Sequence, residues 1–222
     1  FGSYGRAWDW GVGLGVMGIG AICHTLNPRL FAEQLVYIIN HAEDKMLFVD
    51  LTFVPVVEAI ADKIPSIKKY IILTDDAHMP DTVLPNAIAY ETWLAGHDAD
   101  FAWASFDENT AAGLCYTSGT TGNPKGVLYS HRSNVLHGLM ANQPDVFGLT
   151  SRDNVLPIVP MFHANAWALA FAAPAAGACM VMPGAGMDGK SVYELLDTEK
   201  VTCSAAVPTV WLGLLQYLED NS

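Results

Sequence analysis

Apolar and polar positions along the chain form blocks that predict strands and helices in turn. Short continuous apolar runs are typical of strands buried in a parallel sheet. They occur at 21–25, 46–49, 70–73, 155–159, 178–182 and 201–206. Apolar residues at helical spacing lie between several of these runs, at 54–64, 90–94, 192–198 and 210–218. The strand–helix–strand rhythm predicts an α/β fold built on a parallel sheet.

Three predicted helices have a one-sided apolar pattern. The first begins near Asn27-Pro28, because proline is favoured in the first helical turn, and its apolar positions are Phe31, Leu35, Ile38, Ile39 and Ala42. The second is capped by Ser130, and its face consists of His131, Val135, Leu136, Leu139 and Met140. The third, at the end of the chain, presents Trp211, Leu214, Leu215 and Leu218. Each pattern predicts a helix side that packs against other apolar residues.

The stretch with the clearest chemical pattern is 114–127, LCYTSGTTGNPKGV. An apolar run at 111–116 leads into a block of Thr, Ser, Gly and Asn at 117–123, and Lys125 precedes a second β-prone run at 127–129. Glycine-rich turns let successive backbone N–H groups form a concave anion site. Hydroxyl groups add donors, and a lysine adds a point charge suited to phosphate. The order therefore predicts a strand, a phosphate-binding loop and a second strand.

A plain hairpin connection is the alternative for this loop, since Gly, Ser and Thr clusters commonly mark turns. The loop is not a Walker A motif, because Pro124-Lys125-Gly126 stands where that motif has Gly-Lys followed by Ser or Thr. A lysine directly after the loop, in an otherwise acidic chain, favours phosphate binding over a plain turn.

A literal GxGxxG is formed by Gly13, Gly15 and Gly18. In dinucleotide-binding proteins this motif follows a strand, opens a helix and precedes an acidic residue by about twenty positions. The residues before it make a poor strand, and Glu33 and Asp44 straddle the acidic position without filling it. Close helix packing is therefore the favoured interpretation, and an NAD(H)-binding oxidoreductase is the alternative.

A second chemical candidate is PMFHANAW at 160–167, directly after the predicted strand 155–159. Open α/β sheets bind ligands beyond the carboxyl ends of their strands. Small residues here leave room for an apolar group, and a histidine can pair with a carboxylate. From these residues alone, a packed histidine at a helix start is the favoured interpretation.

Composition narrows the functional classes. The 222 residues are 51% apolar, which allows a sizeable core, and carry a net charge of −12. That charge argues against a nucleic-acid or anionic-membrane surface. The run 164–182 is long enough to span a bilayer, but Pro174 and Gly177 interrupt it, so a buried helix, turn and strand is predicted instead. The acidic stretch with Asp75, Asp76, His78 and Asp81 is predicted to be a solvated surface loop, and a metal site is the alternative.

The four cysteines, Cys23, Cys115, Cys179 and Cys203, show no metal-ligand spacing. Most of them lie in apolar runs, which predicts buried, reduced thiols in a cytoplasmic protein. No basic segment precedes an apolar stretch near Phe1, so no secretory signal is predicted.

Residues 114–125 resemble the nucleotide-binding signature of the adenylate-forming superfamily, which includes acyl-CoA synthetases, luciferases and peptide-synthetase adenylation domains. The resemblance extends to 24–30 (HTLNPRL), 40–44 (NHAED), 130–134 (SHRSN) and 201–209. The chain is most similar to bacterial medium-chain fatty acyl-CoA synthetases and 3-methylmercaptopropionyl-CoA ligases. The resemblance implies stacked, mostly parallel sheets flanked by helices. It further implies that 1–222 form part of the large N-terminal domain of such an enzyme, with a subdomain junction near 148–154.

The resemblance also implies an activity. ATP, Mg²⁺ and coenzyme A would be used to convert a small-molecule carboxylic acid, fatty or short-chain, into an acyl-adenylate and then an acyl-CoA. The residues implied to contact the ATP phosphates are Thr117, Ser118, Gly119, Thr120, Thr121, Gly122 and Lys125. The segment 160–167 resembles the second core motif of these enzymes. That motif places His163 beside the substrate carboxylate as the catalytic candidate, and Phe162, His163 and Trp167 at the acyl pocket. No metal ligand is implied in this chain, and homodimer formation is left open.

Several parts of acyl-CoA synthetases have no counterpart in the sequence. These are the aromatic-Gly-x-Thr-Glu segment that helps hold magnesium, the ribose-binding aspartate, the hinge and the C-terminal domain with its catalytic lysine. The alternative hypothesis is therefore a catalytically incomplete module that binds nucleotide, or a partner, without turnover.

Overall fold

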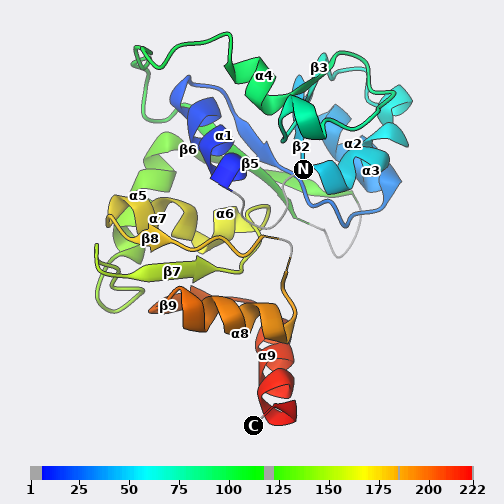
Figure 1. Ribbon diagram of the computed structural model, residues 1–222. Coiled ribbons are helices and arrows are strands. Elements are labelled where there is room, and N and C mark those ends of the chain that lie inside the picture. The colour runs from blue at the N-terminus through cyan, green and yellow to red at the C-terminus, as the bar shows by residue number, and fades with distance from the viewer. Residues whose placement is uncertain (1–6, 118–122, 185, 222) are drawn as a thin grey trace.

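The computed structural model describes residues 7–117, 123–184 and 186–221. Its strands form three sheets of three strands each, and helices lie against them (Figure 1). Within the described residues, β5 and β6 form the one antiparallel pair, and the other five strand pairs are parallel. The predicted α/β class with mostly parallel sheets is therefore confirmed.

Each sheet has its own strand order. The first has the order β1-β5-β6, with β1 at Cys23–Thr25, β5 at Ala111–Thr117 and β6 at Lys125–Ser130. The second has the order β2-β3-β4, with β2 at Met46–Val49, β3 at Lys69–Ile72 and β4 at Ala87–Ala89. The third has the order β8-β7-β9, with β7 at Asn154–Pro157, β8 at Cys179–Met180 and β9 at Cys203–Ala205.

Nine α-helices and three short 3₁₀ turns are found in the described parts of the chain. The helices of the first half are α1 (Ala7–Gly18), α2 (Ala32–His41), α3 (Val54–Glu58) and α4 (Tyr90–Leu94). Those of the second half are α5 (His131–Ala141), α6 (Ala164–Trp167), α7 (Leu169–Ala175), α8 (Gly189–Thr198) and α9 (Pro208–Asp220). The 3₁₀ turns are η1 (Leu51–Phe53), η2 (Ala61–Lys63) and η3 (Asp76–His78). In Figure 1, α9 extends from the bottom of the molecule and ends the described chain.

Two helix boundaries differ from the sequence predictions. The first predicted helix begins at Ala32, because Pro28 lies in a preceding turn that is closed by a hydrogen bond from Leu30 N to Asn27 O. At the start of α2, the Gln34 side chain accepts a hydrogen bond from Phe31 N, which satisfies one otherwise unpaired donor. The predicted helix 54–64 is shorter than expected, since α3 ends at Glu58 and only the 3₁₀ turn η2 follows.

Gly13 and Gly15 of the GxGxxG lie in the interior of α1, and Gly18 is its last residue. A dinucleotide fingerprint requires these glycines at the turn where a strand meets a helix, so that the helix N-terminus faces the pyrophosphate. In α1 the helix has already begun at Ala7, and the motif does not open it. The structure therefore supports helix packing for this motif and removes the geometric basis of the NAD(H) alternative.

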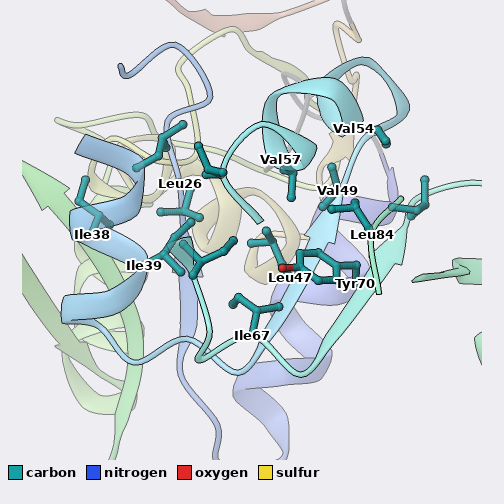
Figure 2. Packing of buried hydrophobic residues seen from close by; sticks show 14 residues of the cluster. Leu26, Ile38, Ile39, Leu47, Val49, Val54, Val57, Ile67, Tyr70 and Leu84 are labelled. Carbon is teal, nitrogen blue, oxygen red and sulfur yellow. The ribbon is translucent and has the colours of Figure 1, made fainter. Parts of the chain in front are cut away.

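The largest hydrophobic core lies between α2, α3 and the second sheet (Figure 2). Ile38 and Ile39 of α2 and Val57 of α3 are almost completely buried there. Tyr70 of β3 lies in the same cluster, and its burial raises the pKa of the phenol above its usual value. The apolar side chains that are periodic in α2 and continuous in β2 and β3 thus pack against one another in a single core.

Two smaller cores surround the third sheet. One contains Val155 of β7 and the buried side of α7, including Leu169. The other joins Leu156 of β7 to Val192 of α8 and to Trp211 of α9, which is partly buried. The run 164–182 therefore forms the predicted helix, turn and strand. Pro174 lies near the end of α7, and β8 follows after the turn.

Some predicted contacts are absent from these cores. The α5 side chains Val135, Leu136, Leu139 and Met140 are exposed. Gly138 and Ala141 are buried instead, because the side of α5 that carries these small residues lies against α7. Asn142, which follows α5, donates a hydrogen bond to Ala172 O of α7. Leu215 and Leu218 of α9 are also exposed. The expected burial of the cysteines holds for Cys115, whereas Cys179 is exposed.

A close approach between α8 and α9 depends on Gly189. A β-carbon at this position would overlap Gly213 O and lie 2.8 Å from Cβ of Tyr217. We expect Gly189→Ala to push the two helices apart and lower the free energy of unfolding by about 1–3 kcal/mol, the usual cost of overpacking. Urea unfolding measures this. Gly213→Ala is the matched control, because its β-carbon would meet no neighbour within 4 Å; an equal loss in both variants would contradict the close-approach argument.

Candidate functional site

The ends of β5 and β6 bring two predicted phosphate-binding residues together. Thr117 is the last residue of β5, Lys125 is the first of β6, and the two are partners in the antiparallel register. Thr117 Oγ1 donates a hydrogen bond of 3.4 Å to Lys125 O. Both residues are exposed. A hydroxyl donor and an ammonium group therefore stand at the same end of the hairpin, which is the arrangement expected of a phosphate cradle.

The other five predicted phosphate contacts lie outside the described residues. They are Ser118, Gly119, Thr120, Thr121 and Gly122. Their assignment stays a prediction from the sequence. The two strands that were predicted on either side of them are confirmed as β5 and β6.

A polar cluster that sequence analysis did not identify lies beside this hairpin end. Tyr116 Oη and His41 Nδ1 are hydrogen-bonded at 2.6 Å, and the ring of Tyr116 lies 5.2 Å from the ring of His24. The Nδ1 atom of His24 lies 3.0 and 2.9 Å from the two carboxylate oxygens of Asp44. A carboxylate only accepts, so His24 Nδ1–H is the donor. Members of α2, β1, β5 and the turn after α2 thus meet at one point.

The surroundings of Tyr116 shift the pKa of its phenol. Removal from water raises the pKa of its phenol above the usual value, and the nearby charges of Asp44 and Tyr37 raise it further. A phenol already carries its proton at neutral pH, and this shift favours that form further, so the O–H of Tyr116 is available to donate to His41 Nδ1. The phenol is thus suited to hydrogen bonding, and it is a poor proton acceptor.

The predicted acyl-site segment has an unusual backbone. Figure 1 labels the short turn α6, yet φ is +45° at Ala164, +54° at Ala166, +56° at Trp167 and +69° at Ala168. Positive φ is uncommon for residues with a β-carbon and is found where surrounding structure holds it in place. The segment is tied to the first sheet by Thr25 Oγ1, which donates a hydrogen bond of 3.2 Å to Met161 O.

A cavity of about 710 Å³ lies between α1, β1, the start of β2 and α7. Most of its lining is apolar, and its size is within the range of small-molecule sites. Phe162 is one of the lining residues, together with Leu114 of β5 and Phe171 of α7. His163 is exposed, and neither His163 nor Trp167 belongs to this lining. Of the three predicted acyl-site residues, only Phe162 therefore reaches the cavity.

Three further observations concern the described residues alone. No group of three or more His, Cys, Asp or Glu side chains in this part of the chain is placed to hold a metal ion. Asp75 and His78, from the acidic loop, hydrogen-bond to each other at the surface. None of the described helices combines the length and apolarity that crossing a bilayer requires.

The sequence of the chain, including the β5–β6 hairpin, matches the model of a known protein family. The model of the AMP-binding enzyme family matches residues 8–222. The chain belongs to this family. The match covers all three sheets of the AMP-binding chain, in addition to the signature that surrounds Thr117 and Lys125.

Relatives of the AMP-binding chain are named as CoA ligases. A medium-chain-fatty-acid–CoA ligase of Ectopseudomonas oleovorans is 48% identical over 206 residues, which are 93% of this chain and 38% of the relative. A 3-methylmercaptopropionyl-CoA ligase of Ruegeria lacuscaerulensis is 50% identical over 200 residues, which are 90% of this chain and 37% of the relative. The chain therefore spans less than two-fifths of the length of these relatives.

The fold is also that of solved family members. The crystal structure of an anthranilate CoA ligase in complex with anthranoyl-AMP has a TM-score of 0.85 and 22% identity, and the match covers 96% of this chain and 40% of that one. A red-emitting luciferase from Phrixothrix hirtus has a TM-score of 0.80 and 21% identity, covering 94% of this chain and 40% of the luciferase. At this level of identity the likeness establishes the fold, which is shared by the AMP-binding chain.

Proposed function

We propose that this chain is part of an ATP-dependent acid–thiol ligase that activates a fatty or short-chain carboxylic acid to an acyl-adenylate and then to an acyl-CoA. The observation that carries the proposal is the pairing of Thr117 with Lys125 at the mouth of a hairpin whose loop has the family signature. The names of the relatives support the same reaction class.

The residues at the hairpin end would act on the first half of the reaction. Attack of the substrate carboxylate on the α-phosphate of ATP releases pyrophosphate and forms the acyl-adenylate. Negative charge accumulates on phosphoryl oxygens, so positioning and charge stabilisation dominate catalysis. Lys125 would supply positive charge, and Thr117 would supply a hydroxyl donor by turning its one O–H from Lys125 O to the phosphate. In the second half, the thiolate of coenzyme A displaces AMP and forms the thioester.

The acyl side of the site is proposed to include Phe162, His163 and Trp167. Phe162 lines an apolar cavity large enough for a small ligand, which supports its place at the pocket. His163 is exposed directly before the left-handed turn, so its imidazole is accessible to a substrate carboxylate. Its proposed role is to bind that carboxylate.

Magnesium is proposed only as the counter-ion of ATP. The carboxylates and imidazoles of the described residues do not gather into a metal-binding group. No step of the reaction is therefore assigned to a metal ligand of this chain.

The proposal has a direct test in the complete gene product. We expect ATP–pyrophosphate exchange that requires a carboxylic acid, and acyl-CoA formation when coenzyme A is added. A panel of short-, medium- and long-chain acids, including 3-methylmercaptopropionate, would identify the preferred substrate. Exchange that no acid of the panel stimulates, together with no thioester product, would contradict the ligase assignment.

The chain spans 37–38% of the length of these relatives, so what the 222 residues do alone is a separate proposal: they bind nucleotide, or a partner, without turnover. Isothermal titration of the chain with ATP, alongside the exchange assay, separates the two. Binding without exchange supports the module, whereas exchange by the 222 residues alone contradicts it.

The domain organisation and location are parts of the same proposal. Residues 1–222 are proposed to form part of one larger N-terminal domain, with a subdomain junction near 148–154 and a C-terminal domain elsewhere in the parent enzyme. The strand order supports the junction, because the strands of the third sheet all follow it and those of the other two precede it. A cytoplasmic location is supported by Cys179 and Cys203, neither of which forms a disulfide.

A further inference from the structure

Tyr116 directly precedes Thr117, the proposed phosphate contact, so a shift of the backbone at Tyr116 would also displace Thr117. It is the penultimate residue of β5, and Thr117 follows it directly. Its register partner across the hairpin is Gly126. A β-carbon at Gly126 would lie 3.2 Å from the Tyr116 ring and 3.2 Å from Leu114 Cδ1. The glycine therefore leaves the space in which the tyrosine ring packs across the hairpin.

The hydroxyl end of Tyr116 is held by α2. His41, the last residue of that helix, shares the 2.6 Å hydrogen bond with Tyr116 Oη. The ring of His41 is itself stacked on Tyr37, one helical turn earlier, with the centroids 5.3 Å apart and the planes at 22°. Two stacked rings on one helix face restrict the orientation of the imidazole, and so fix the point to which the phenol is bonded.

The other side of the ring is held by β1. His24 contacts Tyr116 at 5.2 Å between ring centroids, and its side chain is only 5% exposed. The Asp44 carboxylate, 13% exposed, binds His24 Nδ1 at 2.9 Å and so fixes the ring plane. Because His24 is the register partner of Leu114, this histidine is also anchored through the sheet to β5.

We propose that Tyr116, held between His41 and His24, is a positioning residue that fixes the end of β5 and so directs Thr117 toward the nucleotide phosphates. The inference rests on the proposed ligase function and adds three residues outside the signature, His41, His24 and Asp44, that act through Tyr116. Phosphate contacts lose much of their value when their geometry is displaced by about 1 Å. A strand end that carries a phosphate contact needs such an anchor, because contact residues act only when neighbouring side chains hold them close to the productive geometry.

The test is a double-substitution cycle in the complete gene product. Tyr116→Phe keeps the ring and removes the hydroxyl, and His41→Leu removes the other partner. We expect each to raise the KM for ATP about three- to tenfold, the equivalent of one neutral hydrogen bond. The double variant should be no worse than either single variant, since both remove the same interaction. His41→Asn should restore most of the affinity, because its amide can occupy the position of Nδ1.

Two measurements distinguish positioning from general stability. His78→Leu, which removes an exposed histidine hydrogen-bonded to Asp75, should leave the KM for ATP unchanged. Thermal unfolding should show Tyr116→Phe and His41→Asn to be folded at the assay temperature. An unchanged KM in Tyr116→Phe and His41→Leu, or effects that multiply in the double variant, would overturn the positioning role while wild-type exchange persists. Absence of acid-dependent exchange in the wild type would overturn the ligase proposal and this inference with it.

Discussion

Replacement of Lys125 by alanine is expected to lower the rate of ATP–pyrophosphate exchange by roughly 10- to 100-fold in the complete gene product. One charge-assisted contact to a phosphate is typically worth about 1.5–3 kcal/mol, and each 1.4 kcal/mol corresponds to about a factor of ten. Thr117→Ala should reduce exchange in the same direction, because Thr117 is the register partner of Lys125 at the hairpin end. Steady-state exchange at saturating carboxylate measures both effects.

A matched lysine separates the local effect from loss of net charge. Lys190 is exposed on α8 and lies 3.7 Å from the carboxylate of Glu194. Lys190→Ala removes the same charge and should leave exchange unchanged. Lys125→Arg should recover only part of the activity, because a planar guanidinium does not reproduce the compact ammonium group. Wild-type exchange in both Lys125→Ala and Thr117→Ala would contradict the phosphate-loop assignment.

The second large effect is expected in the core of Figure 2. Leu35 of α2 is 0% exposed and lies in the cluster between α2, α3 and the second sheet. Leu35→Ala removes three carbon atoms from a packed site and leaves a cavity, so we expect the free energy of unfolding to fall by about 2–5 kcal/mol. Urea denaturation monitored by circular dichroism gives this value.

Leu139→Ala provides the control for that measurement. Leu139 also lies in a helix, α5, but is 56% exposed. The same chemical change should alter the free energy of unfolding by less than about 0.5 kcal/mol. Equal destabilisation by the two variants would show that the cluster around α2 is not the dominant core of the chain.

Much of the fold could be predicted because strands buried in a parallel sheet have continuous apolar sequences. The strand at 46–49 and the helix at 90–94 match the structure residue for residue. The strand β4 was not predicted, since Ala87–Ala89 is too short and too weakly apolar to stand out. The outer side of α5 was predicted to be buried, and this was wrong. Periodicity identifies an apolar side, but the close contact with α7 requires the small residues Gly138 and Ala141.

The candidate site could be predicted only where its chemistry is local in sequence. Thr117 and Lys125 belong to one short stretch, and their pairing follows from the hairpin. The group around Tyr116 could not be found in this way. Its members come from α2, β1 and β5, and His41 is 75 residues from Tyr116. Tertiary packing alone brings them together. The one available signal was a histidine, His24, which follows the apolar residues 21–23 in the predicted strand at 21–25.

The pairing of β1 with β5 has a consequence for the order of folding. The β5–β6 hairpin is local, and hairpins of this kind form within about 1–10 μs. Its anchor to the rest of the sheet is not local, because Thr25 and Cys115, which are register partners, are separated by 90 residues. Loop-closure entropy delays such contacts until the intervening chain has become compact. The pairing of β1 with β5 is therefore expected to form late, after the core between α2 and the second sheet. Any destabilisation of that core also weakens the hairpin's anchor, although it touches no residue of the loop.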